Sequence, residues 1–378
     1  MIGAALSLAV WLYLLFARGW FWRMRERAPL AQAGKAPGAG WPSVVAVIPA
    51  RDEAAVVGQA IASLAAQDYA GQFHIVLVDD GSTDGTAEVA RAAAEADRLT
   101  VVRAAPLPAG WSGKLWAVAE GTRQAQRFRP DFLLLTDADI VHGRETLRQL
   151  AARAAEGFDL VSYMATLRCR TPAERALIPA FVFFFFMLYP PVWIADSRHR
   201  TAGAAGGCVF LRAQSLERAG GIAAIRDELI DDCALARAVK RSGGRLWLGL
   251  SAGTESIRAY DTFGEIGRMI ARTAFTELRH SVWLLAGTIL GLAVTYVVPP
   301  VATLAGGKQA AALGSAAWLA MTVAYWPVVR FYRQQWFWAP LLPLAALFYL
   351  GATVYSAVSY WRGAGGQWKG RAQARRQA

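Results

Sequence analysis

Two pairs of aspartates each follow a short, mostly apolar run of the chain. Asp79 and Asp80 come after residues 73–77, and a second pair, Asp137 and Asp139, comes after a similar run. If these runs are parallel strands, both pairs lie at the carboxyl edge of one sheet, where open α/β sheets bind their ligands. Paired carboxylates are ligands that Mg²⁺ or Mn²⁺ prefers, together with phosphate oxygens of a substrate. The pattern predicts a metal-assisted site for a diphosphate-bearing ligand.

The first pair belongs to residues 78–86, which read VDDGSTDGT. Gly81 and Gly85 permit backbone conformations that other residues avoid. The Ser, Thr and Asp side chains between them can bond a turn or the N-terminus of a helix. An ordinary strand-to-helix turn has the same composition, so this segment alone leaves a purely structural alternative open.

Two further acidic segments precede predicted helices. Residues 47–53 read VIPARDE and place Glu53 at a helix start, while residues 228–235 read ELIDDCAL and place Asp231 and Asp232 before a basic helix. Acidic side chains in a first turn stabilise a helix, so capping is the alternative explanation at both places.

Short β-rich runs alternate with alanine-rich helical patterns through the middle of the chain. The predicted strands are residues 44–48, 74–78, 100–103, 132–136 and 160–164. The predicted helices are residues 53–67, 86–95, 114–127 and 144–156. This succession predicts an α/β fold with a mainly parallel, doubly wound sheet.

The order of these motifs resembles that of the family 2 inverting glycosyltransferases, over about residues 43–279. The resemblance implies a Rossmann-like GT-A domain, a nucleotide-sugar donor, in particular a UDP-sugar, and Mg²⁺ or Mn²⁺ as cofactor. It identifies the metal ligands as Asp137 and Asp139, with Asp139 the more direct ligand. The nucleotide-binding residues it implies are Pro49, Ala50, Arg51, Glu53, Asp79, Asp80, Lys114, Asp137 and Arg272.

The same resemblance assigns roles on the acceptor side. Asp232 matches the catalytic base and Asp231 precedes it. Inverting transfer needs a carboxylate that takes the proton of the acceptor hydroxyl, while a metal stabilises the departing diphosphate. The residues that match the acceptor side are Gly206, Gly207 and Cys208, although a tight packing turn would have the same composition.

The sequence departs from the family pattern at two places. An Asn is commoner than the pairing of Arg51 with Asp52. Polymer-forming and ceramide-glycosylating members carry a Gln-x-x-Arg-Trp element, whereas residues 269–273 here read MIART and keep only Arg272. That difference argues against processive polymer synthesis and leaves Arg272 as a diphosphate contact.

Both ends of the chain carry apolar segments. Residues 1–17 have no charged side chain and precede a basic stretch, which predicts a membrane anchor (1–20) with the catalytic domain in the cytosol. A cleaved signal peptide is the alternative, but the segment lacks a basic start and a small-residue cleavage site. Three further stretches approach the length of a bilayer span. They are residues 282–305, 310–329 and 337–361.

The basic residues do not give one consistent orientation for the membrane part. Arg330 and Arg333 suit a cytosolic loop, but three full spans would place the basic tail (362–378) outside, against the positive-inside tendency. One of the stretches could therefore be re-entrant or interfacial. The charge-free segment 177–195 is likewise predicted to lie in the membrane interface, with a buried core segment as the alternative.

Composition limits the partners. The net charge of +12 arises largely from basic residues beside apolar spans, which favours anionic lipid over nucleic acid. Three cysteines without close paired spacing fit a reducing cytosol and argue against a zinc site. The expected regions between the two ends are a basic, Gly/Pro/Ala-rich linker (21–42), a GT-A domain (43–260), an interfacial amphipathic helix (261–281) and transmembrane helices (282–361).

The combination of anchor, helix and C-terminal spans is most similar to the hopene-associated group of membrane glycosyltransferases, relatives of ceramide glucosyltransferases. The resemblance implies a multi-pass enzyme of the inner (plasma) membrane that transfers a hexosyl or N-acetylhexosaminyl group to a lipid hydroxyl, as in hopanoid or glycolipid biosynthesis. Two alternatives stay open: transfer to a polyprenyl phosphate, and a non-catalytic membrane scaffold that retains the fold.

Overall fold

The structure is a computed structural model that describes residues 1–28, 40–363, 367–368 and 371–372. The chain forms two compact units. A helical unit contains Met1–Arg25, Arg168–Val192 and the described chain from Ala259 to Gly363. A sheet unit contains Glu26–Leu167, Trp193–Arg258 and the short described segments after residue 366. The helical unit thus takes a segment from the middle of the predicted 43–260 domain. Half of the predicted linker and most of the predicted tail lie outside the described residues.

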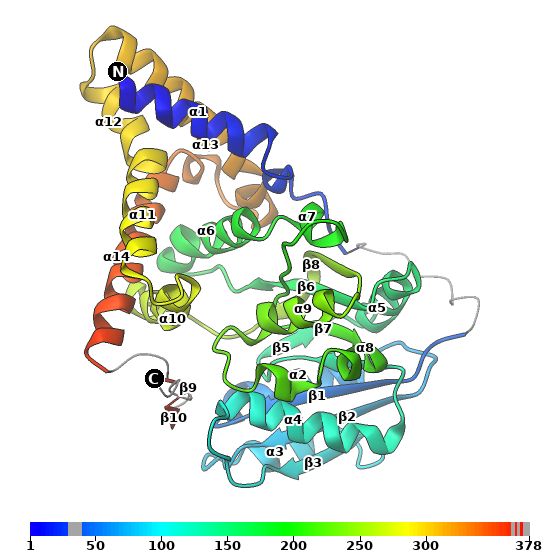
Figure 1. Cartoon of the computed structure of the whole chain (residues 1–378). Helices are drawn as coiled ribbons and strands as arrows, with labels where there is room; N and C mark the ends of the chain where they lie inside the picture. The colour runs from blue at the N-terminus through cyan, green and yellow to red at the C-terminus, as the bar shows by residue number, and fades with distance from the viewer. Residues whose placement is uncertain (29–39, 364–366, 369–370, 373–378) are drawn as a thin grey trace. The chain divides into compact units, whose positions relative to one another are not determined.

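The sheet unit is built on one eight-stranded mixed sheet (Figure 1). Its strands are β1 (Val44–Ala50), β2 (Phe73–Asp79), β3 (Leu99–Arg103), β4 (Phe132–Leu135), β5 (Ile140–His142), β6 (Leu160–Leu167), β7 (Val209–Arg212) and β8 (Leu246–Ser256). They lie in the order β3-β2-β1-β4-β7-β6-β8-β5. The half from β3 to β4 is parallel, and β7 runs antiparallel between β4 and β6. The expected α/β fold with a mostly parallel sheet is confirmed.

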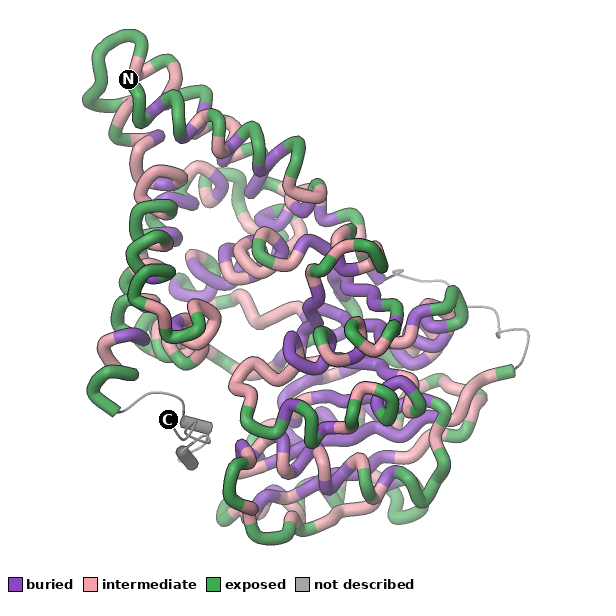
Figure 2. Tube along the Cα trace, in the orientation of Figure 1, coloured by how far each residue is buried: buried purple, intermediate pink, exposed green. Residues whose placement is uncertain are grey.

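The sequence of β1 explains its central place in the sheet. All seven of its residues are buried, as a strand covered on both faces requires. Its neighbours β4 and β2 are buried over residues 132–135 and 75–78, and Figure 2 shows buried residues along much of the sheet. Helix α4 (Gly113–Ala125) packs closely here because Gly121 has no side chain. A Cβ at Gly121 would overlap Val47 and touch Val78.

Helices connect the strands of this unit. They are α2 (Ala54–Ala65), α3 (Thr86–Ala92), α4, α5 (Thr146–Ala155), α8 (Ala213–Arg218) and α9 (Asp231–Arg241), with short turns η2 (Gln126–Phe128) and η3 (Ile222–Ile225); α7 (Pro191–Ala195) joins the two units in the chain. The four predicted helices are present, and α3 ends three residues earlier than its prediction of 86–95. Strands β5, β7 and β8 were not predicted.

The helical unit contains the apolar segments. Its elements are α1 (Ile2–Phe16), η1 (Phe21–Arg23), α6 (Pro172–Leu188), α10 (Phe263–Glu277), α11 (Val282–Leu292), η4 (Ala293–Val297), α12 (Val298–Ala305), α13 (Lys308–Phe331), η5 (Trp336–Trp338) and α14 (Leu342–Trp361). The short strands β9 (Gln367–Trp368) and β10 (Arg371–Ala372) follow in the chain and are grouped with the sheet unit.

Three helical segments in the described chain are long and apolar enough to cross a membrane. They are Val282–Ala305, Lys308–Phe331 and Leu342–Trp361, close to the three predicted stretches. Helix α1 has 15 residues, fewer than the roughly 20 that span a bilayer. The N-terminal membrane anchor therefore stays a prediction.

Helix α6 occupies most of the segment predicted to lie in the membrane interface. A capping box of Thr171 and Glu174 begins the helix, which continues through Pro179. One face, including Phe183 and Phe186, is buried in the helical unit, whereas Leu188 at its end is 47% exposed. The buried alternative describes most of α6, and the interfacial location stays a prediction for its exposed end.

A single lysine joins α9, the helix that begins with Asp231 and Asp232, to the chain before Gly206. The Nζ of Lys240 donates to four main-chain carbonyl oxygens of the loop 193–201. These belong to Trp193 at 3.2 Å, Ile194 at 2.9 Å, Asp196 at 2.9 Å and Thr201 at 2.7 Å. An ammonium group has three protons, so the four acceptors share them.

We expect Lys240→Met to lower the free energy of unfolding by about 2 kcal/mol, because it leaves the four carbonyl oxygens without this charged donor. Thermal unfolding of the detergent-solubilised protein measures the change. The neighbouring Arg241→Met is the control, since Arg241 is exposed on the same last turn. Equal unfolding temperatures for the two variants would contradict this role.

Candidate active site

Lys114 brings together acidic residues from two different elements. It lies in the first turn of α4, whose N-cap Ser112 accepts a hydrogen bond from the backbone of Leu115. Its Nζ is 2.9 Å from Oδ1 of Asp137, beyond β4, and 3.1 Å from Oδ2 of Asp231, at the start of α9. The predicted nucleotide-binding lysine thus contacts one predicted metal ligand and one predicted catalytic residue.

Asp232 is held by the main chain. The backbone N–H of Gly206 donates to its Oδ2 at 2.8 Å, and the backbone N–H of Cys233 donates to its Oδ1 at 2.7 Å. A Cβ at Gly206 would lie 3.3 Å from the same Oδ2. The carboxylate is therefore fixed in one orientation, and the loop that fixes it approaches closely because it has no side chain there.

The surroundings of these carboxylates shift their proton affinities. Burial, followed by the charge of Asp231, raises the pKa of Asp232 to about 7, against the opposing effects of Lys114 and the two backbone donors. Burial also raises the pKa of Asp137. For Lys114 burial alone would lower the pKa, but Asp137 and Asp231 outweigh it and raise the pKa above its usual range. The lysine is thus a permanent cation beside a carboxylate able to exchange a proton near neutral pH.

These groups line one pocket of the sheet unit. Its polar lining includes Lys114, Asp137, Asp231 and Asp232, and its apolar lining comes from β4, β7, α4, α9 and η3. Pro49 at the end of β1 and Gly206 also line it. Five of the sequence-predicted nucleotide-binding or catalytic residues, together with predicted acceptor-side Gly206, therefore share one cavity.

An arginine that the sequence analysis did not single out connects two other predicted residues. The Nε of Arg258, just beyond β8, is 3.1 Å from Oδ2 of Asp139, and its terminal nitrogen is 2.8 and 2.9 Å from the two carboxylate oxygens of Glu53. Ser256 also donates to Asp139, at 2.9 Å. Both carboxylates are largely buried. The only indication in the sequence is a basic residue directly after a strand-like run.

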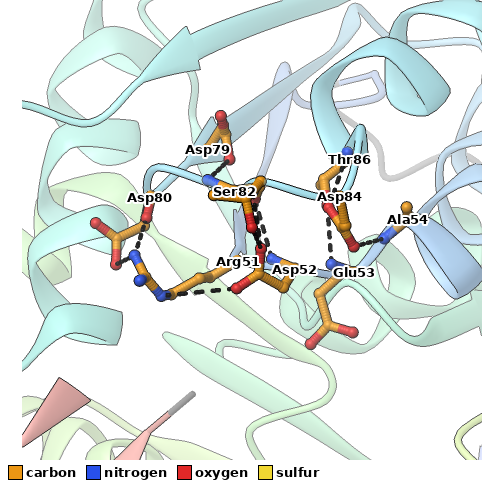
Figure 3. A network of polar contacts seen from close by, with 10 residues as sticks. Arg51, Asp52, Glu53, Ala54, Asp79, Asp80, Ser82, Asp84 and Thr86 are labelled. Atoms are coloured by element: carbon orange, nitrogen blue, oxygen red, sulfur yellow. Dashed lines mark hydrogen bonds and ion pairs between the residues drawn. The ribbon is translucent and has the colours of Figure 1, made fainter. Parts of the chain in front are cut away.

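The segments VDDGSTDGT and VIPARDE hold each other through reciprocal hydrogen bonds (Figure 3). The backbone N–H of Asp52 donates to Ser82 Oγ at 3.0 Å, and its carboxylate accepts from the N–H of Thr83 at 2.9 Å. The next two backbone donors, of Glu53 and Ala54, bond the side chains of Thr86 and Asp84 at 2.8 and 2.9 Å. The polar residues of the first segment therefore cap α2, as their composition allowed.

Arg51 and the two aspartates of VDDGSTDGT complete this network. Arg51 donates to the backbone oxygen of Asp80 and lies 3.7 Å from its Oδ2. Asp79 accepts from the backbone N–H of Ser82 at 3.0 Å. Asp80 is 2% exposed, so Arg51 covers a carboxylate predicted to meet the nucleobase. The nucleoside contacts of Ala50, Arg51, Asp79 and Asp80 stay predictions.

The remaining predicted residues are less clearly placed for catalysis. The side chain of Cys208 is buried in the core, and burial raises the pKa of its thiol to about 12, so it packs rather than faces a ligand. Gly207 is close to β5, since a Cβ there would lie 2.9 Å from Ile140. Arg272 is exposed on α10, in the helical unit, and its diphosphate contact stays a prediction.

The two predicted metal ligands are each paired with a protein cation. Asp137 contacts Lys114 and Asp139 contacts Arg258. No group of three or more His, Cys, Asp or Glu side chains in the described part of the chain is arranged to hold a metal. Two carboxylates nevertheless fit Mg²⁺ or Mn²⁺ when substrate phosphates and water supply the other ligands. The donor set thus suits a metal that binds together with a nucleotide.

A largely parallel sheet with acidic residues beyond its strand ends, and one lysine among them, defines the class of GT-A glycosyltransferases. Residues 42–320 match the family model described as "Glycosyltransferase like family 2", and the chain belongs to this family. The fold is also that of the mannosyltransferase PcManGT from Pyrobaculum calidifontis, solved in complex with GDP-Man and Mn²⁺. The two share 18% identity and a TM-score of 0.53, over 94% of this chain and 99% of that one.

Curated relatives match shorter regions. An undecaprenyl-phosphate 4-deoxy-4-formamido-L-arabinose transferase of Pseudomonas paraeruginosa is 38% identical over 120 residues, 31% of this chain and 34% of the relative. A beta-monoglucosyldiacylglycerol synthase of Synechocystis sp. is 33% identical over 127 residues, 33% of this chain and 26% of the relative. The chain spans about a third of the length of the first of these relatives and about a quarter of the second. Together with the three apolar helices, these relatives indicate a membrane protein.

We expect Arg258→Gln to tighten Mn²⁺ binding in the absence of nucleotide by about tenfold, because the variant removes the cation that competes for Asp139. Titration of free Mn²⁺ by electron paramagnetic resonance measures this directly. Arg212→Gln is the matched control, since Arg212 pairs with Asp159 instead. The same Mn²⁺ affinity in the wild type and in Arg258→Gln would show that the arginine does not compete.

Proposed function

We propose that this protein transfers a sugar from a UDP-sugar to a hydroxyl group of a membrane lipid, with inversion at the anomeric carbon, at the cytosolic face of the inner (plasma) membrane. The single observation that carries the proposal is the pocket in which Lys114 lies between Asp137 and Asp231, with Asp232 held beside them. A fixed base and a fixed cation in one cavity suit the two requirements of glycosyl transfer, which are removal of the acceptor's proton and stabilisation of the leaving diphosphate.

Asp232 supplies the base of this reaction. Its carboxylate takes the proton of the acceptor hydroxyl as that oxygen attacks the sugar. The raised pKa favours this exchange near neutral pH, and the two backbone donors keep one orientation. Asp231 precedes the base in the chain and contacts Lys114, whose charge also favours the ionised form of Asp232.

Lys114 and the carboxylates beyond β4 act on the donor. The ammonium group offsets the charge of the diphosphate leaving group. Asp137 and Asp139 would hold Mg²⁺ or Mn²⁺, which neutralises the departing diphosphate when bound. Arg51 and the buried Asp80 would contact the nucleoside. Glu53 would support the metal ligand Asp139 through Arg258.

The three apolar helices and the names of two relatives support a lipid acceptor. One relative acts on a lipid phosphate by its name, which favours a second candidate, transfer to a polyprenyl phosphate. Such an acceptor is already ionised and needs no base, whereas a hydroxyl does. The fixed carboxylate of Asp232 therefore favours a hydroxyl, and we propose a hopanoid or another glycolipid precursor in particular.

We expect Asp232→Asn to lower the rate of sugar transfer to a lipid alcohol by roughly 10²- to 10⁴-fold, since the amide cannot accept the proton. The assay supplies purified protein with radiolabelled UDP-sugar, Mn²⁺ and lipid extract, and measures labelled lipid. Asp227→Asn is the control, because Asp227 is exposed in the loop before the same helix.

Two outcomes would contradict parts of this proposal. Full activity of Asp232→Asn toward a lipid alcohol would remove Asp232 as the base, and activity only toward a lipid phosphate would favour the second candidate. A scaffold without turnover would give no labelled lipid. It would also show no UDP affinity that depends on Mn²⁺ in a binding titration.

The pH dependence follows from the raised pKa of Asp232. Protonation removes its ability to act as a base, so we expect kcat/KM to fall as the pH drops below about 7. Asp231→Asn removes a neighbouring negative charge that raises this pKa, so the acidic limb should move to lower pH. A pH profile measured from pH 5 to 9 tests both expectations. An acidic limb that is the same in Asp231→Asn and the wild type would contradict the assignment.

A further inference from the structure

Thr136, the residue before Asp137, lies between a histidine and the loop that holds the catalytic base. Its Oγ1 is 2.7 Å from the backbone oxygen of Gly207 and 2.9 Å from Nε2 of His142. A carbonyl oxygen can only accept, so the single hydroxyl proton of Thr136 goes to Gly207. The hydroxyl must then accept from the imidazole, which fixes the tautomer of His142 with its proton on Nε2.

His142 is suited to be a permanent, uncharged donor. It is 3% exposed, and burial lowers its pKa to about 4. Its Nδ1 has no hydrogen-bond partner among the described residues, so a second proton would find no acceptor there. The ring therefore stays neutral, and keeps its bond to Thr136, over the pH range in which Asp232 exchanges its proton.

The loop 205–208 is clamped on its other side by Ser162 of β6. The Oγ of Ser162 accepts from the backbone N–H of Ala205 at 2.8 Å and donates to the backbone oxygen of Cys208 at 3.0 Å. Two buried hydroxyls thus hold the loop, one from β6 and one adjoining the predicted metal ligands. The N–H of Gly206 lies between these attachments and points at Asp232.

We propose that Thr136 and His142 are positioning residues for the catalytic base: by holding the backbone oxygen of Gly207 they orient the Gly206 N–H toward Asp232. The inference rests on the proposed function, because it explains how the base of the proposed reaction is held in its orientation. Thr136 would also connect the acceptor side of the site, where Asp232 lies, with the donor side, because it directly precedes the predicted metal ligand Asp137 in the chain.

The proposal has a consequence for proton affinity. The charged groups that face Asp232 are Asp231 of the same helix and Lys114 of α4, which also contacts Asp137. The Gly206 and Cys233 donors stabilise its ionised form. Only the Gly206 donor lies on the loop that Thr136 holds, so loss of the hydroxyl should weaken this donor alone. The acidic limb of kcat should then move to higher pH.

A matched pair of variants tests this role. Thr136→Val keeps the shape of the side chain without its hydroxyl, whereas Thr136→Ser keeps the hydroxyl. We expect Thr136→Val to lower kcat by about tenfold, the equivalent of one hydrogen bond, with the KM for the UDP-sugar nearly unchanged and the acidic limb displaced upward. Thr136→Ser should retain the wild-type kcat and pH profile.

The results separate this inference from the function on which it rests. Absence of sugar transfer by the wild-type protein would overturn the proposed function. Transfer by the wild type, with the same kcat and acidic limb in Thr136→Val and Thr136→Ser, would overturn the positioning role instead. A drop in kcat without displacement of the limb would also overturn it, since general loss of structure would produce that result.

If thermal unfolding shows that Thr136→Val does not fold, a second pair of variants, at His142, tests the positioning role. His142→Gln can keep a donor near the position of Nε2, and His142→Phe cannot. We expect His142→Phe to displace the acidic limb upward and His142→Gln to resemble the wild type. Identical kcat values and pH profiles for these two variants would overturn the proposal.

Discussion

The charge balance around Lys114 is the constraint on which the rest of the site depends. Asp137, Asp231 and Asp232 line one partly desolvated pocket, where three carboxylates would repel one another and take up protons. One ammonium group, within 3.1 Å of two of them, offsets part of this repulsion and opposes the rise in the pKa of Asp137 and Asp232. In the proposed reaction a donor diphosphate would bring further negative charge into this pocket, so protein and substrate would share the lysine. The arrival of a metal with the nucleotide would restore the balance.

Hydrogen bonds between side chains and main-chain groups determine where these charges lie. The segments VDDGSTDGT and VIPARDE fix one another through backbone donors and short side chains, so β1 and β2 end in a common rigid edge. Lys240 fixes the opposite end of α9 through main-chain oxygens. The acidic groups are therefore presented by a framework in which few long side chains can move, and this favours a site prepared before substrate binds.

The sequence predicted those parts of the molecule whose pattern is local. Strands β1 and β4 are unbroken apolar runs and β2 is a mostly apolar one. The helices that follow them have a clear period, so both kinds of element were predicted and confirmed. Strands β5 and β7 have only three and four residues, and neither length permits a period to be recognised. Arg258 was missed because Glu53, its partner, is 205 residues away in the chain. Lys114 and Arg51 were identified as site residues from the sequence, but the carboxylates with which they pair could not be inferred.

The cradle of Asp232 consists of peptide groups, contributed by Gly206 and Cys233. Point mutation replaces side chains and leaves the peptide N–H in place, so almost no single substitution can delete these donors; proline is the exception. The loop is sensitive instead to the size of the side chains at its glycine positions. Any side chain added at Gly206 would press on the carboxylate, and one added at Gly207 would press on Ile140. The loop therefore keeps its hydrogen-bond donors under most substitutions but cannot accommodate larger side chains at these two positions. Substitutions in related chains should be confined to residues that leave this space open.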